Sequence, residues 1–277
     1  MQYDPIKRSL GNVFNRSAGM RKLFYNLLDL LLLRAWHIHK ELRSLTPNPS
    51  PRERGEAASP IQILDAGAGY GQYSYWLYKR FKKQCNILAI DVKDEQVADC
   101  NKFFQTIGAT NVKFEVGDLT KFVNPGAYDL VVCVDVMEHI LEDELVFRNY
   151  NASMKPGAML IISTPSDQGG SDVHGEGEAS FIEEHVRDGY NINDIQQKLT
   201  RAGFSKVDAR YSYGAPGKIA WRLSMKYPIQ MLGVSKLFFI ILPFYYLIAY
   251  PISFVLNYLD TNMKHSTGTG LIVKAWK

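Results

Sequence analysis

The stretch Leu64-Asp65-Ala66-Gly67-Ala68-Gly69-Tyr70-Gly71 decides the fold of this chain of 277 residues. It ends an apolar run that starts near Ile61, and it leads directly into the helical pattern GQYSYWLYKRFKK. Glycine lets the backbone come close to a ligand, and the first turn of a helix offers unpaired N–H groups to a polar or anionic group. The stretch therefore predicts a strand-to-helix turn that binds a nucleotide-type ligand.

Strand-like runs alternate with helical patterns from Ile61 onwards. The strand-like runs include NILAID, VKFEV, YDLVVCVD and AMLIIST, and the helical ones include DEQVADCNKFFQTIG, EDELVFRNYNASM and NINDIQQKLTRAGF. Such alternation builds β-α units and a mostly parallel sheet. FSKVDARYSY and TGLIVKAWK supply a sixth and a seventh strand, with about fifty residues between them. We therefore expect an α/β fold with a Rossmann-like, mostly parallel sheet of seven strands and helices on both faces.

The composition divides the chain into four parts. An apolar segment over residues 21–43 indicates a partly buried helix, and residues 46–60 carry four prolines with serine and glycine, as an exposed linker does. The expected parts are an N-terminal helical cap (1–45), the linker (46–60), a catalytic domain (61–213 and 266–277) and a helical, apolar and basic insertion between the last two strands (214–265).

A second acidic residue follows the next strand. Asp91 lies twenty residues past Gly71, where a carboxylate can accept hydrogen bonds from both hydroxyls of a ribose. A dinucleotide fingerprint begun at Gly67 needs a third glycine where this chain has Gln72, so a dehydrogenase is disfavoured. The pattern DxGxGxG instead resembles motif I of the class I S-adenosylmethionine-dependent methyltransferases.

Three later segments resemble the same family. Gly117-Asp118-Leu119 resembles the position whose acid reaches the adenine amino group, Tyr128–Asp135 with Val136-Met137-Glu138-His139 resembles motif IV, and Lys155-Pro156-Gly157 resembles the turn before the fifth strand. The resemblance covers residues 60–213 and the last nine residues. It implies S-adenosyl-L-methionine as cofactor, bound by Asp65, Gly67, Gly69, Gly71, Asp91, Val92, Asp118, Leu119 and Asp135.

The candidate catalytic residues follow the fourth strand. Methyl transfer from a sulfonium is an in-line displacement, so the protein mainly aligns the acceptor and removes a proton. Asp135, Glu138 and His139, with His185 downstream, resemble the ExxEH-plus-distant-His pattern of ubiquinone-pathway O-methyltransferases and small-RNA 2′-O-methyltransferases. In those families such residues can hold a divalent metal.

Because aspartate replaces the first glutamate of that pattern, we expect no metal; the candidate ligands for one are Asp135, Glu138, His139 and His185. Without a metal, His139 or His185 is the expected general base, since imidazole titrates near neutral pH. For His185 the alternative is a polar residue that caps its own loop. The other histidines are interpreted as surface residues: His37, His39, His174 and His265.

The insertion combines positive charge with a long apolar run. Lys218, Arg222 and Lys226 recur at four-residue spacing, as in a basic amphipathic helix, and residues 237–259 carry no charge. The run is long enough to span a membrane. However, both ends must return to the same sheet, and Pro243 and Pro251 are expected to break it into shorter helices. We therefore expect a re-entrant or interfacial element, or an apolar lid over the acceptor site.

Charge and cysteine content bear on location. Residues 1–55 hold ten Lys/Arg against four Asp/Glu and residues 214–265 hold five against one, whereas residues 56–213 hold fifteen against twenty-three. Basic flanks suggest an anionic surface or partner, although solvated helix faces explain them equally well. The three cysteines show no disulfide or metal spacing, and no apolar run precedes Leu23. We expect a cytoplasmic protein, peripheral to the inner face of a membrane.

Together these patterns predict a methyltransferase that O-methylates a hydrophobic small-molecule or lipid-linked acceptor at a membrane surface. One alternative is an RNA 2′-O-methyltransferase, which the basic flanks allow and the apolar insertion disfavours. The other is a non-catalytic scaffold protein that keeps the cofactor pocket.

Overall fold

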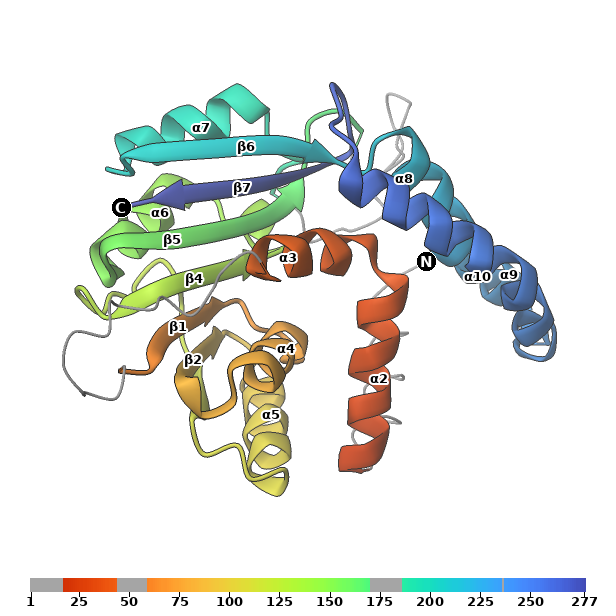
Figure 1. Cartoon of the computed structure of the whole chain (residues 1–277), viewed down its shortest axis with the longest axis horizontal. Coiled ribbons are helices and arrows are strands. Elements are labelled where there is room, and N and C mark those ends of the chain that lie inside the picture. The colour runs from red at the N-terminus through yellow and green to blue at the C-terminus, as the bar shows by residue number, and fades with distance from the viewer. Residues whose placement is uncertain (1–16, 44–58, 170–185, 236) are drawn as a thin grey trace.

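A single sheet of seven strands organises the molecule (Figure 1). The computed structural model describes residues 17–43, 59–169, 186–235 and 237–277. The strand order is β3-β2-β1-β4-β5-β7-β6, and β7 is antiparallel to both of its neighbours while the pairs among β1 to β5 are parallel. The expected Rossmann-like sheet is thereby confirmed. The strands are β1 (Ile61–Ala66), β2 (Cys85–Asp91), β3 (Val112–Val116), β4 (Tyr128–Val134), β5 (Met154–Pro165), β6 (Lys206–Ser212) and β7 (Gly270–Trp276).

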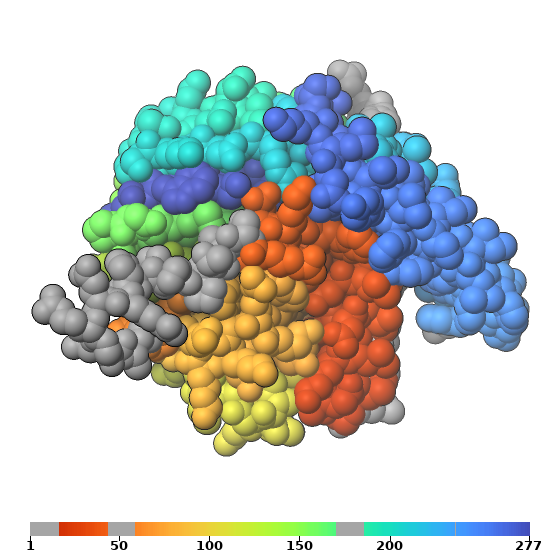
Figure 2. Space-filling model, in the orientation of Figure 1, coloured from red at the N-terminus to blue at the C-terminus, as the bar shows by residue number. Residues whose placement is uncertain are grey.

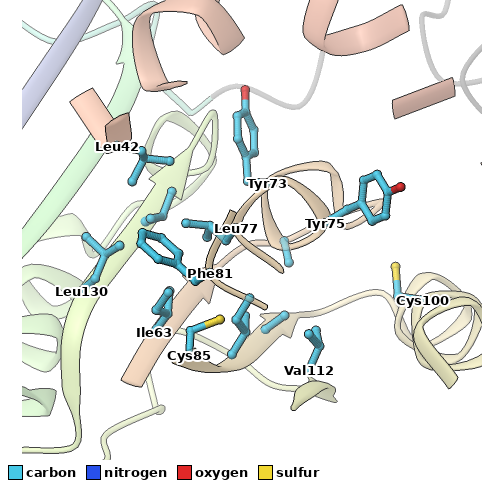
Figure 3. Close-up of a cluster of buried hydrophobic side chains, with 14 of the residues drawn as sticks. Leu42, Ile63, Tyr73, Tyr75, Leu77, Phe81, Cys85, Cys100, Val112 and Leu130 are labelled. Atoms are coloured by element: carbon cyan, nitrogen blue, oxygen red, sulfur yellow. The ribbon is translucent and has the colours of Figure 1, made fainter. Parts of the chain in front are cut away.

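Helices cover both faces of the sheet because neighbouring strand residues point to opposite sides. In β1, Ile63 enters one core and Leu64 the other. Figure 3 shows the first core, where Leu42, Ile63, Leu77 and Phe81 lie together. This face carries α3 (Leu33–Arg43), α4 (Gln72–Phe81) and α5 (Asp94–Thr106), and the other carries α6 (Asp143–Ser153) and α7 (Ile192–Arg201).

The N-terminal segment forms two helices where a single one was expected. Helix α2 (Ala18–Leu31) ends at Leu32, whose extended backbone turns the chain into α3. The run is apolar on more than one helical face, so the turn lets α2 bury Tyr25 beside α4 and α5 while α3 packs over the sheet. Burying apolar surface on both helices favours the break over one straight helix.

Three of the histidines interpreted as surface residues are buried, so that interpretation is wrong for them. His37 and His39 point inward from α3, and the side chain of His265 is also covered. His37 bonds to Asp260, and His39 stacks on Trp76 with ring centroids 4.4 Å apart. Partners far away in the sequence offset the cost of burying these imidazoles. No local sequence pattern reveals such partners. His174 lies outside the described residues.

The insertion is a helical hairpin that projects from the body (Figures 1 and 2). Its outgoing arm contains α8 (Ala215–Trp221), a π-helical turn η3 (Arg222–Lys226) and α9 (Tyr227–Val234), and α10 (Phe238–Asn262) returns. Ser212 pairs with Gly270, so the hairpin leaves and rejoins the sheet at one edge.

Helix α10 runs unbroken through Pro243 and Pro251, so the expectation that these prolines divide it is wrong. Each proline removes one backbone hydrogen bond, and both rings lie on the exposed side, where no packed neighbour forces the helix to end. Within the described part of the chain, α10 is the one helix long and apolar enough to cross a membrane, judged by length and composition alone. Its mean hydropathy reaches 2.0.

Candidate cofactor and acceptor site

The glycine turn after β1 leaves open space above its backbone. The amides of Gly67 and Ala68 donate to the carbonyl of Ile90, at 2.8 and 3.0 Å, and tie the turn to β2. Gly67 has a φ of +76°, and a Cβ there would lie 2.3 Å from Val136. Gly69 has a φ of +51°, yet its Cβ would meet nothing closer than 4.0 Å. Gly67 is therefore required by the protein's own packing, whereas the room over Gly69 can admit a ligand.

The outer side of the same turn is held by α2. The buried guanidinium of Arg21 donates to the carbonyl of Tyr70 at 3.1 Å, and the hydroxyl of Tyr25 donates to the same oxygen at 2.5 Å. Gly71, with a φ of +78°, then starts α4, and its packing against Phe114 leaves no space for a side chain. Arg21 and Tyr25 were missed by the sequence analysis because no motif marks them.

Asp91 ends β2 and faces the turn. One carboxylate oxygen accepts from the amide of Gly69 at 2.7 Å, and the other accepts from the amide of Lys93 at 2.9 Å. Each oxygen retains lone pairs, so the group can also accept from two hydroxyls of a bound ribose. Val92 follows β2 directly and Val116 ends the neighbouring strand β3. Both side chains are exposed and provide apolar surface for a planar ring.

The other predicted cofactor residues have more structural surroundings. The buried carboxyl of Asp65 accepts from Ser74 Oγ at 2.6 Å, and burial raises its pKa to about 6 although this bond opposes the shift. Asp118 lies near the surface, where bonds from Thr120 lower its pKa. Leu119 is packed in the second core. Asp65 thus anchors the glycine turn to α4, while Asp118 remains accessible.

Motif IV is met by side chains from three other parts of the chain. Asp135 follows β4 with a φ of +53° and forms an ion pair with Arg34 of α3. The amide of Arg34 donates to the hydroxyl of Tyr213 at 3.0 Å. Tyr73 of α4 is buried beside them, and its hydroxyl has no hydrogen-bond partner in the described part of the chain. Arg34, Tyr73 and Tyr213 were not predicted, because only the fold brings them to Asp135.

The residues after Asp135 point in different directions. Glu138 is 1 % exposed and accepts from Thr164 Oγ1 at 3.1 Å. Burial, followed by the charge of Asp135, raises the pKa of Glu138 to about 8, so the group is mainly neutral at pH 7. His139 is exposed at the end of the short turn Met137–His139. His185 lies outside the described residues.

The described residues contain no group of three or more His, Cys, Asp or Glu arranged to hold a metal ion. Of the four candidate ligands, Asp135 is paired with Arg34 and Glu138 bonds to Thr164. The described geometry therefore offers acid–base and electrostatic groups around motif IV.

Comparisons with known proteins agree with this geometry. A family model described as a methyltransferase domain matches residues 58–205, just over half of the chain. Phosphoethanolamine N-methyltransferase 1 of Arabidopsis thaliana is 28% identical over 160 residues, covering 53% of this chain and 29% of that protein. The human mitochondrial ubiquinone biosynthesis O-methyltransferase is 29% identical over 136 residues, covering 48% of this chain and 35% of that protein. The chain thus spans about a third of the length of these relatives.

Solved structures show the same fold. Phosphoethanolamine N-methyltransferase 2 of Haemonchus contortus, in complex with S-adenosyl-L-methionine, superposes with a TM-score of 0.55 at 16% identity, over 80% of this chain and 50% of that one. The [4+2]-cyclase SpnF superposes with a TM-score of 0.56 at 15% identity, over 88% and 81%. A cyclase among the neighbours shows that this fold alone does not fix the reaction. With the family match over residues 58–205, the chain belongs to the methyltransferase domain family and has the fold of the class I S-adenosylmethionine-dependent methyltransferases.

Proposed function

We propose that this chain is an S-adenosyl-L-methionine-dependent methyltransferase that O-methylates a hydrophobic small-molecule or lipid-linked acceptor at a membrane surface. The observation that carries the proposal is the open space over Gly69 facing Asp91, in a chain of the methyltransferase domain family. RNA 2′-O-methylation is less well supported, because the insertion exposes many large apolar side chains.

The turn fits the cofactor on structural grounds. Gly69 leaves its backbone open to a ligand, Asp91 offers lone pairs to ribose hydroxyls, and Val92 offers exposed apolar surface beside them. Asp118 is accessible at the next strand end and can accept from an exocyclic amine. When bound, S-adenosyl-L-methionine supplies an electrophilic methyl group on a sulfonium. Asp65 and Gly71 hold the turn in place.

Acceptor activation is assigned to the surroundings of Asp135. Glu138 is buried and bonded to Thr164, whereas histidine is the side chain most often used as a general base, so this role is assigned to His139 or His185. His139 is exposed one residue further along the turn that follows Asp135. The ion pair between Asp135 and Arg34 lies beside this turn and can orient an acceptor oxygen.

The hairpin is proposed to hold the protein on a membrane. Helix α10 exposes Phe239, Ile240, Phe244, Leu247 and Ile248, which a soluble surface would not favour. Burying each such side chain contributes roughly 1.5 to 3 kcal/mol, whereas a basic residue near anionic headgroups contributes about 1 kcal/mol. Apolar contact should therefore dominate binding, so high salt should release little protein from membranes and detergent should release most of it.

The reaction is tested by transfer of a labelled methyl group to separate lipid, small-molecule and RNA fractions. We expect the label in an apolar fraction, on an oxygen. His139→Ala and His185→Ala should each be compared with the wild-type chain, and loss of the base should lower the rate about 100-fold or more. The affinity for S-adenosyl-L-methionine should stay unchanged in both variants. Label in RNA would favour the rival activity, and binding of cofactor without transfer to any fraction would favour a scaffold role.

The membrane arrangement is tested by thiol labelling on sealed vesicles that contain anionic lipid. The native cysteines Cys85, Cys100 and Cys133 are buried, so introduced ones report their own surroundings. Val234→Cys lies at the hairpin tip, where Val234 is 82% exposed, and Met263→Cys lies at its root. We expect the root to react from outside and the tip to be shielded from both aqueous sides. Labelling of the tip from the lumen would show that the hairpin crosses the bilayer.

A further inference from the structure

A small cavity lies at the root of the hairpin, outside the glycine turn and motif I. Its volume is about 60 Å³, and it is enclosed by the corner between α2 and α3, the π-helical turn and α10. Leu31 and Leu32 at the helix corner contribute apolar lining, as do Trp221 and Met225 of the hairpin. A cavity of this size can take a single hydroxyl with the first atoms of an attached apolar chain.

The polar part of the lining connects the cavity to motif IV. Arg34 lines the cavity and is also the partner of Asp135, so a molecule held here lies one side chain away from the end of β4. Tyr213 also lines the cavity, and its hydroxyl accepts from the amide of Arg34. Among the described residues that line the cavity, Arg34 carries the one charge, and it is positive. Its ion pair with Asp135 leaves no net charge to hold an ionic head group, and burying an unpaired charge is costly, so an uncharged, hydroxylated head group is favoured.

A buried amide oxygen lacks a partner at this position. Asn257 of α10 is 2% exposed and lines the cavity, yet its Oδ1 has no hydrogen-bond partner in the described part of the chain. One helical turn earlier, Ser253 Oγ is also buried and also lacks a hydrogen-bond partner among the described residues. Buried polar groups in folded proteins are nearly always bonded to protein, water or ligand. The inner face of α10 therefore presents hydrogen-bonding capacity that a bound hydroxyl can use.

The π-helical turn supports the same assignment. Such turns are rare and occur frequently at functional sites. Here the turn places Ser224 and Met225 at the cavity. The hydroxyls of Tyr245 and Tyr246 donate to the carbonyls of Leu223 and Ser224, each at 2.7 Å, so α10 itself holds the turn in shape.

We propose that this cavity binds the polar end of an amphiphilic acceptor that carries a hydroxyl and no positive charge, while the apolar part of that molecule follows α10 towards the membrane. The proposal rests on the proposed function, because it names the acceptor class and the residues that select it. Asn257 and Arg34 recognise the head group, and Trp221 and Met225 contact the adjoining apolar part of the acceptor.

The test uses the full chain, with 1-octanol and the octyltrimethylammonium cation as probes in calorimetric titrations. Met225→Trp fills the cavity, and Ile219→Trp places the same indole on the exposed face of α8 as a matched control. We expect 1-octanol to bind wild type and Ile219→Trp within twofold of each other, and Met225→Trp at least tenfold more weakly. The cation should bind wild type at least tenfold more weakly than 1-octanol.

A second variant keeps the test valid should Met225→Trp fail to fold. Asn257→Leu removes the unpartnered oxygen, so thermal stability should be unchanged or higher, while 1-octanol affinity should fall about threefold to tenfold, the range for one hydrogen bond. Unchanged affinity in the folded variants, or equal binding of the cation, would overturn the proposal. Binding of S-adenosyl-L-methionine is measured on the same samples. If wild type does not bind S-adenosyl-L-methionine, the proposed function is overturned, regardless of the affinity for 1-octanol.

Discussion

Replacing Glu138 by glutamine should stabilise the protein at alkaline pH. The carboxyl is buried, accepts from Thr164 and lies near Asp135, and burial followed by this charge raises its pKa from 4.5 to about 8. Between these two values the folded state holds a proton that the unfolded chain has released. Stability contributed by the protonated group is therefore lost as the pH rises through this window. Glutamine keeps the shape and an acceptor for Thr164, and it has no proton to lose.

The shift sets the size of the effect. At 1.36 kcal/mol for each pH unit, a rise from 4.5 to about 8 corresponds to at most about 5 kcal/mol at pH 8.5, and to about 1 kcal/mol at pH 5. Urea unfolding of the full chain at both pH values measures the difference. Glu144→Gln, which removes a partly exposed carboxylate paired with Arg201, is the control and should change stability little at either pH. If wild type and Glu138→Gln lose stability in parallel from pH 5 to 8.5, Glu138 ionises like a surface carboxylate and the reasoning is refuted.

Two further predictions concern aspartates with defined partners. Asp91→Ala should weaken S-adenosyl-L-methionine binding by about 1 to 3 kcal/mol, because it removes the acceptor that also holds the amide of Gly69; unchanged affinity in calorimetry would contradict the cofactor assignment. Asp260→Asn should lower the free energy of unfolding by about 3 kcal/mol, because the buried carboxylate accepts from His37 and from the amides of Tyr213 and Gly217. The exposed Asp208→Asn is its control and should stay within about 0.5 kcal/mol of wild type; equal urea unfolding of both variants would show that the Asp260 contacts add no stability.

The sheet and the cofactor end could be predicted from the sequence because their signals are local. The alternation of strand and helix patterns fixes the β-α units, and the glycine turn at Gly67 and Gly69 is specified by positive φ values that few other residues adopt. Asp91 follows at the end of the next strand, so its distance along the chain determines its place in space. Each of these features depends on residues close together in the sequence.

The surroundings of Asp135, where the acceptor is proposed to bind, could not be predicted in this way. Arg34 and Tyr213 lie more than 170 residues apart, yet their hydrogen bond forms beside Asp135. The turn at Leu32 follows from competition between two packing surfaces, which an apolar run on several helical faces does not resolve. Whether α10 continues through Pro243 likewise depends on the exposure of this residue, which the local sequence does not encode.

The predicted parts of the site lie inside the family match, and most of the unpredicted parts lie outside it. The family model matches residues 58–205, so Arg34 lies before the match, and Tyr213 and Asn257 lie after it. These three residues line the cavity, whereas the cofactor turn lies inside the family match. Function resides in sites built on a fold rather than in the fold itself, so the unmatched segments are the expected source of specificity.

The same unmatched segments join the hairpin to the reacting end of the sheet. Arg210 donates to Nδ1 of His37, and since guanidinium can only donate, Nε2 of His37 carries the proton that binds Asp260 near the end of α10. Asp260 also accepts from the amide of Tyr213, whose hydroxyl accepts from the amide of Arg34, the partner of Asp135. A connected chain of hydrogen bonds of this kind restrains the residues that it links. If α10 enters a leaflet as proposed, its root therefore holds motif IV at a fixed height above the membrane, and the acceptor must reach the methyl group by rising along α10.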